Sequence, residues 1–250
     1  SNVGTVKMTF AAGGAEAQKP FLDRLGLLQR PVLEVPETTK PLVQQRWPDI
    51  VAATVSYGHG ISVSPLQFTE AVATLVSDGK RIPASFLRRN PADLPDGPQV
   101  ISERTIKDLR WLLWLTVERG TGGNGGVDGY MVGGKTGTAD KPTGARRGYD
   151  GRAVFSSFVG EFPVEAPRYA VLTMLDEPQG DARTYGYRTC GWTAATVVSR
   201  IITQAGPLLG VPPKSPAIEA GFADRLQVMP VMNDRTKRME DGFAAASLTR

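Results

Sequence analysis

The spacing of apolar residues changes part way along the chain. Up to Gly120, apolar residues recur at intervals of three and four, which is the period of amphipathic helices. After Gly129 they fall into short runs that predict strands. A last helical pattern spans 191–209 and ends before Pro212. Helices followed by an antiparallel sheet and a closing helix indicate α+β organisation.

Proline, glycine and capping residues set the expected boundaries. Ser64 is predicted to be an N-cap with Pro65 at the first helical position, and Ser102 to cap a second helix. Four prolines make 29–50 an expected extended loop, and 120–129 is glycine-rich and expected to be flexible. We predict helices at 3–10, 19–28, 65–77, 103–119 and 191–209, and strands at 82–87, 130–138, 154–162 and 169–175.

Composition excludes some classes of function. The chain has 250 residues, of which 41% are hydrophobic and 22% charged, as in ordinary globular proteins. The net charge of +4 comes from scattered basic residues, so we expect no nucleic-acid surface. No apolar run reaches the ~20 residues of a membrane helix. Because the chain starts at Ser1 without a methionine, we expect upstream sequence, where any membrane anchor or export signal would lie.

Cysteine and histidine are too few for several kinds of site. Cys190 is the only cysteine, which excludes an internal disulfide. With His59 as the only histidine, a zinc site built from His and Cys is excluded too. A Ser-His-Asp triad would have to use His59, whose glycine-rich surroundings favour an ordinary loop residue.

The stretch Gly133 to Ala139 fits two catalytic patterns. Gly129, four residues, then Gly134, Lys135 and Thr136 match the phosphate-binding loop G-x-x-x-x-G-K-[ST]. Such a loop follows a buried strand and opens a helix. Here glycines precede the matching segment where the strand should be, and a stretch with proline and glycine follows where the helix should be. A P-loop NTPase is therefore the weaker of the two interpretations.

The second pattern is the K-T-G element of serine acyl-transfer enzymes, formed by Lys135, Thr136 and Gly137 on a strand. A lysine neutralises a substrate carboxylate, and the hydroxyls of Thr136 and Thr138 can bind the same group. Gly137 has no Cβ, so substrate can lie against the strand, and the Thr138 N–H can donate to an oxyanion. Three residues alone recur by chance, so a solvated strand lysine is the alternative.

Other segments strengthen the second interpretation. Gly133 to Ala139 resembles the transpeptidase domain of penicillin-binding proteins, and the strongest resemblance is to the division-type class B enzymes. Residues 1–213 carry it, and 214–250 are predicted to be a C-terminal tail. The further matching segments are Tyr57 to Gln67, Ser77 to Lys80 with Ile82-Pro83, Leu175 to Pro178, and Gly191 to Pro212.

The resemblance implies a fold and a function. The fold would be the C-terminal portion of the penicillin-binding or serine β-lactamase-like transpeptidase fold, an antiparallel sheet flanked by helices. The activity would be peptidoglycan D,D-transpeptidation through an acyl-serine, with β-lactams as further ligands. Lys135, Thr136, Gly137 and Thr138 would bind substrate, and Lys135 and Thr138 would also serve catalysis. Ser1-Asn2-Val3-Gly4 matches the end of the family's S-S-N-x-G, so Asn2 would be a further catalytic residue and would bind the substrate amide. The resemblance implies neither a metal nor an organic cofactor.

One family motif has no counterpart here. The nucleophile motif S-x-x-K precedes S-x-N in this family, and it would therefore lie upstream of Ser1. Ser77 to Lys80 matches S-x-x-K in letters, but Asp78 and Gly79 end a helix where the motif must open one. We expect these 250 residues alone to be inactive without that N-terminal half of the domain. A non-catalytic sensor or scaffold module is the alternative.

The resemblance also implies a location and partners. The family is anchored by an N-terminal helix in the cytoplasmic membrane, with this domain facing the periplasm or cell exterior. The expected partners are peptidoglycan stem peptides and division proteins, without nucleic acid.

Overall fold

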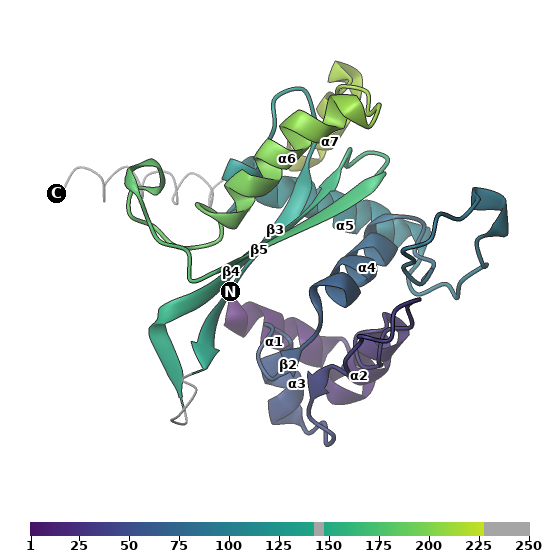
Figure 1. Cartoon of the computed structure of the whole chain (residues 1–250), viewed down its shortest axis with the longest axis vertical. Helices are drawn as coiled ribbons and strands as arrows, with labels where there is room; N and C mark the ends of the chain where they lie inside the picture. Colours follow the sequence, from purple (N-terminus) through teal and green to yellow (C-terminus); the bar gives the residue numbers. More distant parts are fainter. Residues whose placement is uncertain (143–147, 228–250) are drawn as a thin grey trace. The chain divides into compact units, whose positions relative to one another are not determined.

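Helices dominate residues 1–109, and a three-stranded sheet organises the rest of the chain in the computed structural model (Figure 1). The structure describes residues 1–142 and 148–227. The chain divides into two compact units, the first ending at Leu109 and the second beginning at Arg110.

The first unit is built from short helices and a two-stranded ribbon in which β1 pairs antiparallel with β2. Leu25, Leu27, Ala71 and Val100 form its buried core. The elements are α1 (Asn2–Ala11), α2 (Gly14–Arg24), β1 (Leu42–Val43), α3 (Asp49–Val55), β2 (Ile61–Ser62), α4 (Pro65–Val76) and η1 (Pro91–Asp93).

The start of α4 confirms the predicted cap. The Ser64 hydroxyl accepts from the Gln67 N–H at 3.2 Å, and the Gln67 side chain accepts from the Ser64 N–H at 3.4 Å. This capping box satisfies donors that a helix start leaves unpaired. The buried Gln67 amide also donates to the Gly26 and Gln29 carbonyls at 3.1 and 2.7 Å, which fixes the chain after α2 against α4.

Two predictions in this unit are wrong. Residues 82–87 form no strand. Pro83 has no N–H, and carboxylates take the next donors: Ala84 donates to Glu70 at 3.2 Å and Phe86 donates to Glu34 at 3.1 Å. The helix expected from residue 19 instead begins at Gly14 and continues through Pro20, a residue that usually belongs to a first turn.

The second unit contains the predicted sheet, in the order β3-β4-β5 and antiparallel throughout. Its first strand begins at Gly133 rather than Tyr130, and α6 packs along one face of the sheet (Figure 1). The elements are α5 (Glu103–Arg119, which begins in the first unit), η2 (Gly123–Gly125), β3 (Gly133–Pro142), β4 (Tyr149–Phe162), β5 (Tyr169–Asp176), η3 (Ala182–Thr184), α6 (Ala194–Leu208) and α7 (Pro216–Gln227).

The Phe158 ring occupies the centre of this unit, in one core cluster with Val198 and Ile202 of α6. Glycines surround it. A Cβ on Gly134 would lie 2.4 Å from the ring, and one on Gly125 would lie 2.7 Å from it. The glycine-rich segment 120–129 therefore closes on an aromatic ring, a use of glycine that the sequence interpretation as a flexible loop did not include.

Helix α7 lies in the segment predicted to be a tail and packs on α5. The rings of Trp114 and Phe222 meet edge to face at 5.6 Å, and the Trp111 indole donates to the Phe222 carbonyl at 3.1 Å. Residues 228–250 lie outside the described part, and the boundary at 213 stays a prediction. Among the helices that the structure describes, none has the length and apolar character needed to cross a membrane.

Glu161 on β4 is a buried acid. Its side chain is 1% exposed, and in the described part of the chain neither carboxyl oxygen has a hydrogen-bond partner. Desolvation raises the pKa of Glu161 to about 8, although the nearby Arg110 guanidinium acts in the opposite direction. The folded state therefore holds this carboxyl in its neutral form at moderately acid pH.

Glu161 makes stability depend on pH. A folded pKa of about 8 lies above the ordinary glutamate value of 4.5, so the native state binds one more proton than the unfolded state between these two pH values. The free energy of unfolding should fall as pH rises from 4.5 to 8, by an amount on the order of 5 kcal/mol. Glu161→Gln should flatten this profile in urea titrations at stepped pH, while the exposed Glu118→Gln should leave it unchanged. A wild-type profile that rises over this window would contradict the assignment.

Gly134 should not tolerate a side chain. Its Cβ would lie 2.4 Å from Phe158 Cζ and 2.8 Å from the Val159 carbonyl oxygen, so Gly134→Ala should destabilise the protein by about 1–3 kcal/mol. Gly221→Ala, whose Cβ meets nothing within 4 Å in α7, should be neutral or stabilising. Thermal melts of both variants test this, and the double variant Gly134→Ala/Phe158→Leu should lose less than the two single changes added together.

Candidate functional site

The stretch Gly133 to Ala139 forms the first part of β3, which is an edge strand of the three-stranded sheet. Lys135 pairs with Val159 on β4, and Thr136 pairs with Phe158. Because side chains alternate along a strand, Thr136 and Thr138 share the face that carries Phe158 and α6, and Lys135 starts on the other face.

This placement shows that the P-loop interpretation is wrong. Gly134, Lys135 and Thr136 lie within a paired strand, and the chain continues as that strand to Pro142. A phosphate-binding loop would leave a strand here and open a helix.

The Lys135 ammonium forms hydrogen bonds with the next residue of its own strand, Thr136. Its Nζ donates to the Thr136 carbonyl at 2.8 Å and to the Thr136 hydroxyl at 3.2 Å. In the described part of the chain these partners are uncharged oxygens, so the positive charge is not neutralised. Further along β3, Lys141 instead bonds to Asp176 at 2.8 Å and Glu177 at 2.6 Å, and these hydrogen bonds raise the pKa of Lys141.

The two threonine hydroxyls each meet a residue from another segment. Thr136 Oγ1 lies 2.9 Å from Thr121 Oγ1, at the end of the turn after α5. Thr138 Oγ1 donates to the sulfur of Cys190 at 2.9 Å. Sequence reasoning missed both neighbours. No local sequence pattern predicts these contacts, because Thr121 lies 15 positions from Thr136 and Cys190 lies 52 positions from Thr138.

Gly137 is exposed on β3, and its role in binding substrate stays a prediction. Its carbonyl accepts from the Ser157 hydroxyl at 3.0 Å, and a Cβ at this position would lie 2.7 Å from that same oxygen. A side chain here would displace Ser157 from this contact. The strand thus presents a cation, two hydroxyls and an uncovered backbone side by side, which is suited to a carboxylate lying along it.

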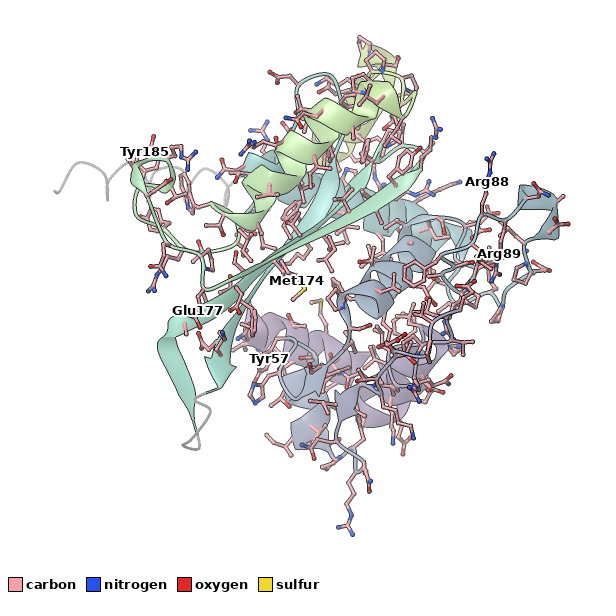
Figure 2. The ribbon with its side chains drawn as sticks, in the orientation of Figure 1. Tyr57, Arg88, Arg89, Met174, Glu177 and Tyr185 are labelled. Atoms are coloured by element: carbon pink, nitrogen blue, oxygen red, sulfur yellow. The ribbon has the colours of Figure 1, made fainter. Side chains whose placement is uncertain are left out.

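An aromatic cluster follows on the loop between β5 and α6. The Trp192 ring stacks on Tyr187 and meets Tyr185 edge to face, each at 5.4 Å between centroids. Tyr185 is 76% exposed and stands at the outer part of this loop (Figure 2). Trp192 follows Cys190 by two residues, which ties this exposed aromatic surface to the segment that contacts Thr138. The sequence reasoning assigned it no role.

Asn2 opens α1, where the Ser1 hydroxyl accepts from the Gly4 N–H at 3.4 Å. The structure adds a capping role for Ser1, to which the sequence assigned none. Asn2 is exposed and belongs to the first unit, whereas Lys135, Thr136, Gly137 and Thr138 belong to the second. The structure brings the four β3 residues together, and the role of Asn2 stays a prediction.

The S-x-x-K letters of Ser77 to Lys80 do not form a nucleophile site. Ser77 is the C-cap of α4, and Gly79 turns the chain away with a φ of +78°. The Lys80 ammonium bonds to the Asp96 carboxylate. A nucleophile motif needs the opposite geometry, with serine at a helix start and lysine one turn on.

Other kinds of site find no support among residues 1–142 and 148–227. No group of three or more His, Cys, Asp or Glu side chains there is arranged to hold a metal ion. His59 is an exposed loop residue.

Sequence comparison gives this geometry its context. The family described as penicillin binding protein transpeptidase domain matches residues 1–201. A probable peptidoglycan D,D-transpeptidase FtsI of Caulobacter vibrioides is 36% identical over 240 residues, which cover 89% of this chain and 41% of that protein. A probable peptidoglycan D,D-transpeptidase PenA of Neisseria meningitidis is 35% identical over 223 residues, covering 88% and 37%. The chain thus spans about two fifths of the length of these relatives.

Solved structures agree. The apo transpeptidase domain of penicillin-binding protein 3 from Burkholderia pseudomallei has a TM-score of 0.77 at 35% identity, over 86% of this chain and 64% of that one. A mycobacterial penicillin-binding protein 3 complexed with ampicillin has a TM-score of 0.74 at 28% identity, over 86% and 51%. Both the predicted α+β fold and the predicted family are confirmed. This chain belongs to the transpeptidase domain family of the class B penicillin-binding proteins.

Proposed function

We propose that the protein carrying this chain is a serine-type peptidoglycan D,D-transpeptidase that also binds β-lactams. The observation that carries the proposal is the edge strand β3, where an unneutralised Lys135 ammonium lies beside the Thr136 hydroxyl. The names of the relatives, which include probable peptidoglycan D,D-transpeptidases, support the same activity. Division-type duty follows from the resemblance to FtsI and PenA.

The reaction divides into two acyl transfers. A serine hydroxyl, from an S-x-x-K segment preceding Ser1, attacks the penultimate D-Ala carbonyl of a stem peptide. The new C–O bond replaces the C–N bond, and the terminal D-Ala leaves after its nitrogen gains a proton. An amine of a neighbouring stem then attacks the acyl-serine, and the serine oxygen recovers its proton.

The β3 residues would bind the donor's terminal carboxylate. Lys135 offers charge, and Thr136 and Thr138 offer hydroxyl donors, so a carboxylate or the corresponding group of a β-lactam receives charge-assisted hydrogen bonds. Gly137 lets the donor backbone lie against the strand. The Thr138 N–H would share the developing oxyanion with the N–H of the nucleophile. Asn2 would bind the substrate amide, as the Asn of the family's S-x-N motif does.

The proposal extends to location and partners. An upstream helix would anchor the protein in the cytoplasmic membrane, with this domain facing the periplasm or cell exterior. Peptidoglycan stems are the substrates, the N-terminal half of the domain supplies the nucleophile, and division proteins are the expected partners. No cofactor takes part in the proposed chemistry.

Removal of Lys135 tests the carboxylate site. In the full-length protein, Lys135→Ala should lower the rate of labelling by a fluorescent penicillin at least about tenfold, since a hydrogen bond to a charged group contributes about 1.5–3 kcal/mol. Gel fluorescence at timed intervals measures this rate. Lys107→Ala, at an exposed position of α5, should label like the wild type. Undiminished labelling of Lys135→Ala would refute the assigned role.

The 250 residues alone should not label. They contain no helix-opening S-x-x-K within the described part, so no serine is activated for acylation. Incubation with the same penicillin, followed by intact-mass measurement, checks this. A penicilloyl adduct would show that Ser77 or another serine of this chain reacts. If the full-length protein also fails to label, the non-catalytic sensor or scaffold alternative gains instead.

A further inference from the structure

Thr121 lies outside every motif that the sequence singles out, yet its hydroxyl contacts the proposed carboxylate site. It precedes η2 on the glycine-rich segment 120–129, and its Oγ1 is 2.9 Å from Thr136 Oγ1. Both residues remain accessible, since Thr121 is exposed and Thr136 is half-buried. The pair therefore opens to solvent at the edge of the sheet.

The backbone around Thr121 is held on several sides. The Gly122 N–H donates to the Thr116 carbonyl at 3.0 Å, which ties the turn to the end of α5. Asn124 donates to the Gly191 carbonyl at 2.8 Å. Gly191 packs so closely that a Cβ there would lie 2.6 Å from the Thr121 carbonyl oxygen.

The Phe158 ring adds a further restraint on the same turn. A Cβ on Gly122 would lie 3.2 Å from that ring, and one on Gly125 would lie 2.7 Å from it. The backbone that carries Thr121 is therefore held in place, and its exposed side chain is directed by the 2.9 Å contact with Thr136.

The hydroxyl groups of Thr121 and Thr136 have a limited number of donors and acceptors. A threonine hydroxyl has one hydrogen to donate and two lone pairs to accept with. The Thr136 oxygen accepts from the Lys135 ammonium at 3.2 Å and shares a second hydrogen bond with Thr121. The two threonines own two hydroxyl hydrogens, of which one spans the pair. The other is not used within the pair and is available to donate to an acceptor such as a carboxylate.

We propose that Thr121 is a positioning residue that directs one hydroxyl hydrogen of the Thr121–Thr136 pair toward the carboxylate of a donor stem peptide or β-lactam. This inference rests on the proposed function. Without Thr121, the Thr136 hydroxyl turns freely about its C–O bond and donates outward only part of the time. The ligand then loses a preorganised donor, while the backbone of β3 stays where the sheet holds it.

Two probes that differ only in the carboxylate test the proposal. In the full-length protein, Thr121→Val should lower the second-order rate of acylation by benzylpenicillin about three- to tenfold, the range for one hydrogen bond. The rate with benzylpenicillin methyl ester, which has no carboxylate, should change less than about twofold. Intact-mass measurement at timed intervals gives both rates. Thr121→Ser, which restores the hydroxyl, should recover the benzylpenicillin rate.

Controls separate this inference from folding and from the proposed function. Thr203→Val, at an exposed position of α6, should leave both rates unchanged. Melting temperatures show whether Thr121→Val is folded, and Thr121→Ala, which also lacks the hydroxyl, replaces it in the same measurements if it is not. Equal losses with both probes, or no loss with either, would overturn the positioning role while acylation of the wild type upholds the proposed function. A wild type that neither probe acylates would overturn the proposed function and this inference with it.

Discussion

The packing of the Phe158 ring is the constraint on which the rest of the second unit depends. The ring comes from β4, is fully buried and shares a cluster with Val198 and Ile202 of α6. The backbone closes on it at Gly134 of β3 and at Gly125 of η2, where no other residue fits without a clash. Gly134 immediately precedes Lys135, so the core that holds the sheet together also fixes where the functional strand begins.

The charges along β3 differ in a way that favours anion binding at one end. Lys141 is neutralised by Asp176 and Glu177, and an added anion would have to compete with both carboxylates. Lys135 contacts the carbonyl and hydroxyl oxygens of Thr136, which direct the ammonium without cancelling its charge. An anion at Lys135 therefore gains a charge-assisted contact at a smaller cost in broken ion pairs.

The sequence predicted the features that depend on local chemistry. The cap at Ser64, the helix from Pro65 and the antiparallel order of the three strands are all confirmed. The strand at 82–87 was wrong because Glu34 and Glu70, distant in sequence, take the N–H groups that a strand would have used. Strand propensity depends only on residues that are neighbours in the sequence, so it cannot predict hydrogen bonds to carboxylates as distant as these.

In the candidate site too, some features depend on neighbouring residues in the sequence and others on residues that are distant in the sequence. The seven residues from Gly133 to Ala139 specify which groups line the strand, and these could be interpreted from the sequence. A hydroxyl, however, has a free torsion, and its direction is set by whatever lies against it. For Thr136 and Thr138 those neighbours are Thr121 and Cys190, which only the folded chain brings into contact. A chain with the same seven residues and a residue other than threonine or serine at 121 would keep the backbone of this strand but change the direction of the Thr136 hydroxyl.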